Sequence, residues 1–310
     1  MKNSNNEMID VSVIVPNYNH AAFLRQRIDS ILNQTFQNFE LIILDDCSTD
    51  NSKEIINSYA EHPRISHIIF NTINSGSPFA QWEKGINLAI GQYIWIAESD
   101  DWCEPSLLES LLEGIRKDEE CVISYCQLSC INGENKIKWQ SKHPLLSEIV
   151  DSQTFIRDFL AIKVSIFNAS MAIFRKDIFQ HVSEEFVTFK FCGDWFFWLQ
   201  IARYGKVHIS GKVLNYFRKH DKDVSGKAYK SGLNIIEEIK VTNWMYEEKL
   251  IDDSLYEKAF KKQYKAYWKV KNSIEPANRD RIRSLLAMPL SSKINTLKFL
   301  PSAIWNALRK

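Results

Sequence analysis

Short apolar runs alternate with amphipathic segments through the first two fifths of the chain. Four runs have the length and the β-branched or aromatic content of buried strands, at residues 11–15, 39–44, 65–70 and 93–97. Each is followed by a segment whose apolar residues recur at helical spacing. Four successive strand–helix units predict an α/β protein with a parallel sheet covered by helices on both faces.

The helix predicted after the first strand shows this spacing clearly. Leu24, Ile28 and Ile31 fall on one face and are expected to pack against the sheet. Arg27 lies outside this apolar stripe, so we expect it to face solvent.

The second half of the chain has a mixed pattern. Strands are predicted at residues 121–125, 169–174 and 213–217. An aromatic helix is predicted from Gly193, with Gly205 as its C-cap. From about Tyr229 to Lys271 the pattern is helical, and the one domain boundary that we expect lies near residues 225–226.

Two of the four predicted parallel strands run directly into pairs of acids. Asp45 and Asp46 follow the second strand, and Asp100 and Asp101 follow the fourth. Because parallel strands share their carboxyl ends, both pairs are expected at one edge of the sheet, where open α/β sheets bind ligands. Close carboxylates suit a hard divalent cation, although the same residues also suit solvated turns. The shared edge favours a ligand site.

Composition and charge narrow the function further. The chain has 310 residues, of which 45% are hydrophobic and 25% charged, and a formal net charge of +1, which argues against a general nucleic-acid binder. Its six cysteines have no C-x-x-C spacing and are expected to be reduced thiols. With a polar start and no apolar run of membrane-spanning length, a cytoplasmic protein is expected.

The C-terminal segment differs from the rest of the chain. From Arg281 onwards it has six basic residues and no acid, and residues 293–310 include an apolar set with Trp305. These features suit a peripheral contact with an anionic membrane, here the inner face of the cytoplasmic membrane. The same apolar face equally suits packing on the protein's own helices or on a second protomer in a homodimer.

Several motifs, taken together in their order and spacing, resemble glycosyltransferase family 2. They are Val-Ser-Val-Ile-Val-Pro-Asn-Tyr-Asn at 11–19, Ser-Ile-Leu-Asn-Gln-Thr-Phe at 30–36, Asp-Asp-Cys-Ser-Thr-Asp at 45–50, Gly-Gln-Tyr-Ile at 91–94 with Asp100-Asp101, and Gly193-Asp194. The resemblance covers residues 11 to about 225 and implies the GT-A fold, with a mostly parallel, Rossmann-like donor-binding half. The domains expected are a glycosyltransferase domain at 1–225, with a donor half at about 10–120 and an acceptor half at 121–225, and a C-terminal helical extension at 226–310.

The resemblance also implies an activity. It is the inverting, metal-dependent transfer of a sugar from a nucleotide-diphosphate sugar, expected to be a UDP-sugar, to a hydroxyl of a glycan or lipid-linked acceptor in surface polysaccharide synthesis. Two alternatives from other classes stay open, a nucleotidyltransferase and a non-catalytic nucleotide-sugar-binding subunit. No glycine-rich phosphate loop follows the first strand, which argues against the nucleotidyltransferase.

Roles for individual residues on the donor side follow from the same resemblance. Tyr18 would lie against the nucleobase, Asp46 would accept its hydrogen bond, and Pro16 would shape the pocket. Asp100 would face the ribose or the metal, and Asp101 would ligate Mg or Mn. Trp82-Glu83 replace the family's usual Arg-Asn pair, so Lys84 or Gln81 is expected to supply the basic or polar donor contact. Asp45 is interpreted as support for its turn.

The remaining roles concern the second half of the chain. The resemblance implies that Asp194 is the general base, although an aspartate after Gly193 is also an ordinary helix N-cap. Arg218 and His220 resemble a loop that closes over the diphosphate, with a solvated loop as the alternative. Trp195 or Trp198 could form an acceptor-sugar platform, with the protein core as the default location.

Overall fold

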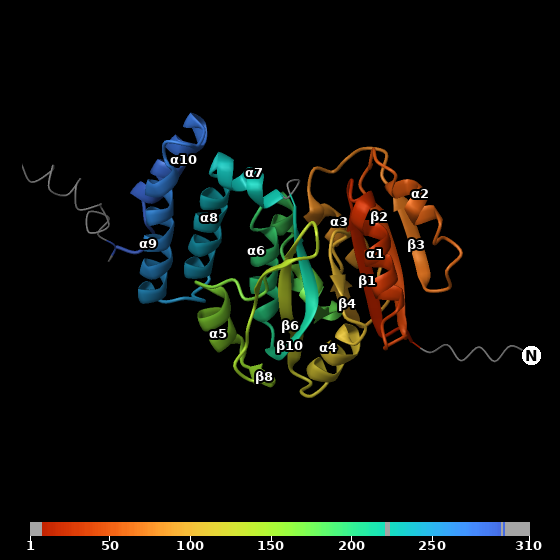
Figure 1. Ribbon diagram of the computed structural model, residues 1–310. Helices are drawn as coiled ribbons and strands as arrows, with labels where there is room; N and C mark the ends of the chain where they lie inside the picture. The colour runs from red at the N-terminus through yellow and green to blue at the C-terminus, as the bar shows by residue number, and fades with distance from the viewer. Residues whose placement is uncertain (1–7, 221–223, 293, 295–310) are drawn as a thin grey trace, which may run out of the picture. The chain divides into compact units, whose positions relative to one another are not determined.

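The computed structural model describes residues 8–220, 224–292 and 294 of the chain (Figure 1). Contacts divide the chain into two units. The first comprises Met1–Ser152, Ile166–Thr188 and Phe197–His220, and the second comprises Gln153–Ser165, Phe189–Phe196 and Asp221–Lys310. The second unit therefore includes two segments from the middle of the chain as well as the C-terminal helices.

The first unit is built on one mixed sheet of ten strands, with β3-β2-β1-β4-β9-β6-β10-β5 as its main path. The strands are β1 (Val11–Asn17), β2 (Phe39–Asp45), β3 (Ile65–Phe70), β4 (Tyr93–Ile96), β5 (Trp102–Cys103), β6 (Cys121–Asn132), β7 (Ile137–Gln140), β8 (Ser147–Val150), β9 (Ala172–Arg175) and β10 (Lys206–Lys219). Off this path, β7 pairs with β6 and β8 pairs with β10.

The four predicted N-terminal strands are confirmed, and they form the parallel part of the sheet. β1 pairs in parallel with β2 and with β4, and β2 pairs in parallel with β3. The later part is mixed, because β9 runs antiparallel to both β4 and β6. β1 continues through Pro16 to Asn17, which pairs with Asp45 in β2. This register brings the ends of the first two strands together at one edge.

Helices follow the parallel strands as expected. They are α1 (Ala21–Leu32), α2 (Ser52–Asn57), α3 (Pro78–Leu88) and α4 (Leu107–Ile115). The predicted apolar stripe of α1 is fully buried, but the prediction that Arg27 faces solvent is wrong, because Arg27 is also fully buried. Its guanidinium lies over the ring of Trp95 in β4, 5.1 Å from the ring centroid. The aromatic face supplies a favourable contact for a buried cation.

The aromatic helix α6 (Gly193–Ala202) begins in the second unit and ends in the first. The prediction of Gly205 as the C-cap is wrong, because α6 ends at Ala202 and the φ of Gly205 lies outside the left-handed region typical of a glycine cap. A Cβ atom on this residue would lie 2.3 Å from the backbone oxygen of Glu120. Glycine is needed here because two backbone segments approach closely at the start of β10.

The helical region predicted after residue 226 is confirmed. After the short α5 (Ser152–Phe155), the second unit contains α7 (Val224–Ser231), α8 (Leu233–Glu247), α9 (Asp253–Val270) and α10 (Pro276–Ala287), and α8 packs against α9 and α10 (Figure 1). Gly232, with φ of +80°, separates α7 from α8, and Asp252 caps α9 by accepting from the Leu255 N–H.

Within the described ranges, no helix has both the length and the apolar character needed to cross a bilayer. The membrane or dimer contact expected for residues 293–310 lies outside the described residues, apart from Ile294. All six cysteines are free, and five of them are buried.

Candidate active site

The carboxyl ends of β1 and β2 are joined by side-chain hydrogen bonds. Asn17 Nδ2 donates to Asp45 Oδ2 at 2.7 Å, and the Ser48 N–H donates to Asp45 Oδ1 at 2.9 Å. Asp45 is buried and uses both oxygens inside the turn. This geometry agrees with its interpretation as support for the turn, and it fixes the backbone from which Asp46 projects.

Asp46 lies at the centre of a polar hydrogen-bond network. Its Oδ1 accepts from Asn71 Nδ2 at 2.7 Å, from the Ser75 N–H at 2.9 Å and from Gln81 Nε2 at 3.0 Å. Its Oδ2 accepts from the Ser75 hydroxyl at 2.7 Å. Lys84 Nζ donates to Asn71 Oδ1 at 2.6 Å and so belongs to the same network. Because α3 and the loop before it hold the carboxylate, Asp46 has a fixed orientation at the sheet edge.

Tyr18 and Pro16 lie near this network and differ in exposure. Pro16 is buried within β1, whereas the Tyr18 side chain directly after the strand is 47% exposed. An exposed aromatic ring at the carboxyl edge of parallel strands is available to stack on a planar ligand.

The second acid pair lies on the loop after β4 and meets two histidines. Asp100 Oδ2 lies 3.1 Å from His220 Nε2, and His20 Nδ1 lies 2.8 Å from the hydroxyl of Ser99. One ligand atom from each of His20, Asp100 and His220 lies within 4.8 Å of the others, and in the described part of the chain these three form the one group able to hold a metal ion. Two imidazoles with one carboxylate suit a divalent transition ion and are a poor set for Mg²⁺, which prefers oxygen ligands.

The charge state of Asp100 favours this role. Burial opposes ionisation, but the hydrogen bond from His220 and the charges of His20 and His220 outweigh it and lower the pKa of the Asp100 carboxyl. Asp100 is therefore ionised at neutral pH, as a metal ligand must be.

Asp101 has a different environment from Asp100, and its predicted role as a metal ligand stays a prediction. It is fully buried, its Oδ2 accepts from the Ser170 hydroxyl at 2.7 Å, and its Oδ1 accepts from the Arg218 N–H at 3.0 Å. Burial and the charge of Asp100 raise the pKa of the Asp101 carboxyl to about 7. Both oxygens are occupied inside the protein, so Asp101 supports the loop while its neighbour faces the cluster.

Arg218 likewise differs from the expected diphosphate-closing residue. Its side chain is 2% exposed. The Nε donates to the backbone oxygen of Asp100, Nη1 to Asn135 Oδ1 and Nη2 to Gln26 Oε1, at 2.8–2.9 Å. The guanidinium also lies over the Phe23 ring, 4.6 Å from its centroid. Because its donors are committed to the protein, Arg218 clamps the loop after β4 and leaves His220 as the residue that reaches the cluster.

Glu98, the first acid after β4, is held by Trp82 Nε1 at 2.9 Å. Burial, followed by the charges of Asp100 and Asp101, raises the pKa of the Glu98 carboxyl to about 8. Glu98 therefore carries a proton at neutral pH, and among the three acids after β4 the negative charge is concentrated on Asp100.

Asp194 lies in the second unit, at the second residue of α6. Its Oδ1 accepts from the Trp195 N–H at 2.7 Å. Burial raises the pKa of the Asp194 carboxyl to about 6; the N–H of Trp195 opposes the rise, and the charge of Glu237 adds to it. A partly buried carboxylate with this pKa is ionised at neutral pH but is more basic than an ordinary aspartate, which suits proton abstraction.

Glu237 on α8 holds the backbone that leads into α6. Its carboxylate accepts from the N–H groups of Lys190, Phe191 and Cys192 at 2.8–2.9 Å. Three N–H donors before a helix start would otherwise be unsatisfied, so this buried carboxylate fixes the backbone from which Asp194 projects.

The two tryptophans expected as an acceptor platform are buried, which corrects that expectation. Trp195 is 7% exposed, and its Nε1 donates to the backbone oxygen of Leu160 at 3.0 Å. Trp198 is 1% exposed and makes edge contacts with Phe174 and Phe197. Neither ring has an accessible face on which a sugar could stack.

Sequence reasoning missed His20 and Glu237. His20 follows the first strand by three residues, so the shared-edge argument applied to the acids could have included it. Glu237 had no comparable signal, since it lies within a helix that is distant in sequence from the segment it holds.

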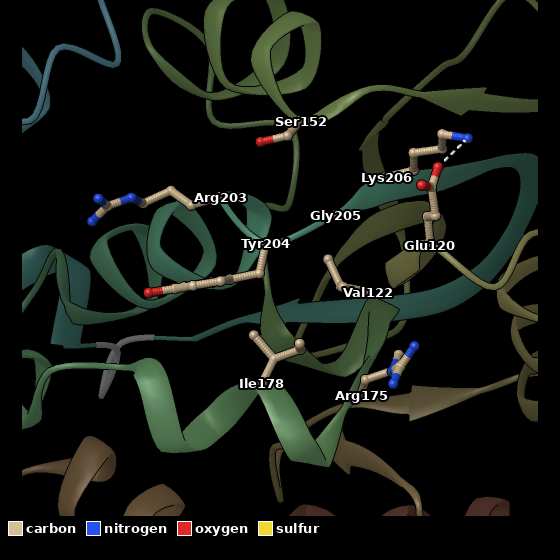
Figure 2. A pocket seen from close by; sticks show the side chains of 9 residues that line it. All are labelled: Glu120, Val122, Ser152, Arg175, Ile178, Arg203, Tyr204, Gly205 and Lys206. Atoms are coloured by element: carbon tan, nitrogen blue, oxygen red, sulfur yellow. Dashed lines mark ion pairs between the residues drawn. The ribbon is translucent and has the colours of Figure 1, made fainter.

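A pocket at the opposite edge of the sheet lacks this chemistry (Figure 2). It lies where β6 and β10 begin and β9 ends, and its lining includes Arg175, Tyr204 and Lys206. Arg175 pairs with Asp177, and Lys206 pairs with Asp118 and Glu120. Two of its cationic side chains are therefore neutralised by acids of the chain itself.

The fold and the polar edge define an α/β protein whose ligand site lies at the carboxyl ends of parallel strands. The family model described as glycosyl transferase family 2 matches residues 12–183, and the chain belongs to this family. It is 37% identical over 114 residues to the glycosyltransferase GlyG of Streptococcus pneumoniae, a match that covers 36% of this chain and 38% of that protein.

A second relative is the poly(ribitol-phosphate) beta-glucosyltransferase of Bacillus spizizenii, 33% identical over 149 residues, covering 46% of this chain and 23% of that protein. The chain thus spans less than half the length of either curated relative. A solved structure, S. aureus TarS 1–349 in complex with UDP-GlcNAc, has a TM-score of 0.68 at 18% identity, with 95% of this chain and 82% of that chain covered. This likeness shows that the chain has a GT-A-like fold.

Proposed function

We propose that the chain transfers a sugar from a nucleotide-diphosphate sugar to an acceptor hydroxyl, with inversion of the anomeric centre and with a divalent metal. The observation that carries the proposal is the cluster of Asp100, His20 and His220 at the same sheet edge as Asp46. The named ligand of TarS, UDP-GlcNAc, supports a UDP-sugar as donor. The name of the Bacillus spizizenii relative supports a glycan or lipid-linked acceptor in surface polysaccharide synthesis.

On the donor side, Tyr18 would stack on the nucleobase, Pro16 would shape the floor of its pocket, and Asp46 would accept the hydrogen bond of a base N–H. Both oxygens of Asp46 accept from Asn71, Ser75 and Gln81 in the structure, so a base N–H would replace one of these donors. Lys84 lies one hydrogen bond further out in this network and would supply the positive charge that the family's arginine usually provides.

The metal would be held by Asp100 with His220 and His20. Of Mg²⁺ and Mn²⁺, the two imidazoles favour Mn²⁺. When bound, it supplies positive charge that neutralises the departing diphosphate. Arg218 and Asp101 hold the loop from which Asp100 projects, so the cluster would bind the ion with little rearrangement.

Asp194 would act as the general base. Its carboxylate would accept the proton of the acceptor hydroxyl as the oxygen attacks the anomeric carbon. A single base acting opposite the leaving group gives inversion, as it does in inverting hydrolases. The pKa of about 6 leaves Asp194 ionised at neutral pH and strong enough to share the proton in the transition state.

A donor screen tests this function. The purified chain is incubated with UDP- and GDP-sugars labelled in the sugar, with Mn²⁺ or with EDTA, and release of the nucleoside diphosphate and of labelled product is measured. Release of UDP that depends on Mn²⁺ supports the proposal. Transfer of the nucleotide itself would indicate a nucleotidyltransferase, and tight binding without release of UDP would indicate a non-catalytic subunit; either result would overturn it.

A further inference from the structure

Two large aromatic rings lie together at the surface of the first unit. Trp139 in β7 is 41% exposed and Phe167 is 43% exposed. Their ring centroids are 5.2 Å apart, with 66° between the ring planes. Leaving this much aromatic surface in water costs free energy, and a paired aromatic surface is typical of a binding site.

Trp139 is connected through the sheet to the metal cluster. It pairs with Cys130 in β6, and Cys130 pairs with Phe217 in β10. The next residue, Arg218, donates to the backbone oxygen of Asp100. Two strand spacings of about 4.8 Å place the Trp139 backbone about 10 Å from that of Phe217.

Two further contacts tie the aromatic pair to the same edge. The turn between β6 and β7 carries Asn135, whose Oδ1 accepts from Arg218 Nη1 at 2.8 Å. Phe167 precedes by three residues Ser170, whose hydroxyl donates to Asp101 at 2.7 Å. Both rings therefore lie on segments that are hydrogen-bonded to Arg218 or Asp101, the residues that hold the loop of Asp100.

We propose that the Trp139–Phe167 pair is an acceptor subsite that binds a pyranose ring of a glycan chain. This inference rests on the proposed glycosyltransferase function. The apolar C–H face of a pyranose stacks on an aromatic ring, while its hydroxyls need polar neighbours. Lys138 and Gln140 lie on the other face of β7, because successive side chains of a strand alternate. The polar neighbours would come instead from the Asn135–Arg218 network at the same edge, which an acyl chain would not require.

The test compares Trp139→Ala and Phe167→Ala with the unaltered chain. The control is Tyr204→Ala, because Tyr204 is 44% exposed but lines the pocket at the opposite sheet edge (Figure 2). Two quantities are measured, UDP binding with Mn²⁺ by calorimetry, and binding of the UDP-loaded protein to an array of immobilised oligosaccharides. The melting temperature of each protein variant is measured first, to show that it is folded.

We expect UDP binding to be unchanged in every variant. The affinity for saccharides is expected to fall about tenfold or more in Trp139→Ala and in Phe167→Ala, because each loses one aromatic stacking face. The Tyr204→Ala control should bind the array normally, and Trp139→Phe should restore most of the binding.

If Trp139→Ala and Phe167→Ala bound the array as well as the unaltered chain does, the proposed subsite would be wrong. So would binding of UDP with no saccharide retained, or retention on lipid vesicles instead of saccharides. Failure of the unaltered chain to bind UDP would instead contradict the proposed function, so the two failures are distinguishable.

Discussion

Glu237 on α8 accepts a hydrogen bond from the backbone N–H of Cys192 at 2.8 Å, directly before the helix that carries Asp194. The same carboxylate accepts from the N–H groups of Lys190 and Phe191. It thus does two things, since it satisfies three buried donors and also places a negative charge near Asp194. The first effect concerns stability and the second concerns the pKa of the proposed base.

Replacing Glu237 with Gln is expected to destabilise the protein by about 1–3 kcal/mol, because an amide cannot accept three N–H bonds and loses the charge that strengthens them. The measurement is the free energy of unfolding in urea. Glu247→Gln is the matched control, since Glu247 lies on the same helix and is exposed. Equal stability of the two variants would show that Glu237 does not hold the start of α6.

The pH dependence of sugar transfer should show the titration of Asp194. A base must be deprotonated, so kcat/KM should rise as pH increases through about 6 and then reach a plateau. In Glu237→Gln the neighbouring negative charge is gone, which favours the ionised carboxylate, and the rise should move to lower pH. The assay uses one buffer mixture at constant ionic strength. A profile that is flat between about pH 5 and 7 would contradict Asp194 as the base.

Asp194→Asn should separate catalysis from folding. Turnover is expected to fall by about two to four powers of ten, the usual contribution of a positioned base. Because the pKa in the folded protein is about 6, against an ordinary 3.8, the folded state binds the proton more tightly. The ionised carboxylate therefore costs stability above about pH 6, and this cost disappears as pH falls towards 4.

Asn carries no such charge, so this variant should be more stable than the unaltered chain by about 1–2 kcal/mol at pH 7.5, and the difference should vanish near pH 4. Thermal unfolding at the two pH values measures it. A variant that melts lower at pH 7.5 and still transfers sugar normally would identify Asp194 as a cap.

The buried cation Arg27 acts on the pKa of two acids that follow β4, and replacing it tests this effect. Arg27→Met keeps most of the side-chain volume but removes the cation whose charge opposes the raised pKa of Glu98 and Asp101. Without the cation both carboxyls should keep their protons to higher pH, so the variant should lose stability relative to the unaltered chain as pH rises from about 7 to about 9. Arg25→Met on the same helix is the control, because Arg25 is exposed. Equal melting temperatures for the two variants would contradict this role.

Much of the fold follows from local pattern. The strand runs at 39–44 and 65–70 were predictable because continuous β-branched residues between turns have few alternatives, and the parallel arrangement followed from the order of elements. Arg27 was not predictable in this way. Its burial depends on the Trp95 ring of a strand far away in sequence, which no helical periodicity reveals.

The location of the site at the carboxyl edge of the sheet was predictable from the sequence, but the contacts of its individual side chains were not. The two acid pairs identified the carboxyl edge, yet the pattern could not show which acid of Asp100 and Asp101 turns inward. That choice depends on Ser170 and Arg218, which meet Asp101 only in the folded sheet. The same limit applies to Trp198, because a run of aromatic residues does not show which rings remain exposed after packing.

The contrast between the two neighbouring aspartates gives the sharpest test of the metal site. Asp100→Asn should abolish the effect of Mn²⁺ on UDP binding, because it removes the ionised ligand between His20 and His220. Asp101→Asn should keep that effect, since its pKa of about 7 means that Asp101 is already protonated much of the time, and an amide can still accept from the Arg218 N–H and donate to Ser170. Calorimetry of UDP binding with Mn²⁺ and with EDTA measures both variants, and melting temperatures confirm that each is folded. If Asp101→Asn alone lost the dependence on Mn²⁺, Asp101 would be the ligand and the assignment of Asp100 would be wrong.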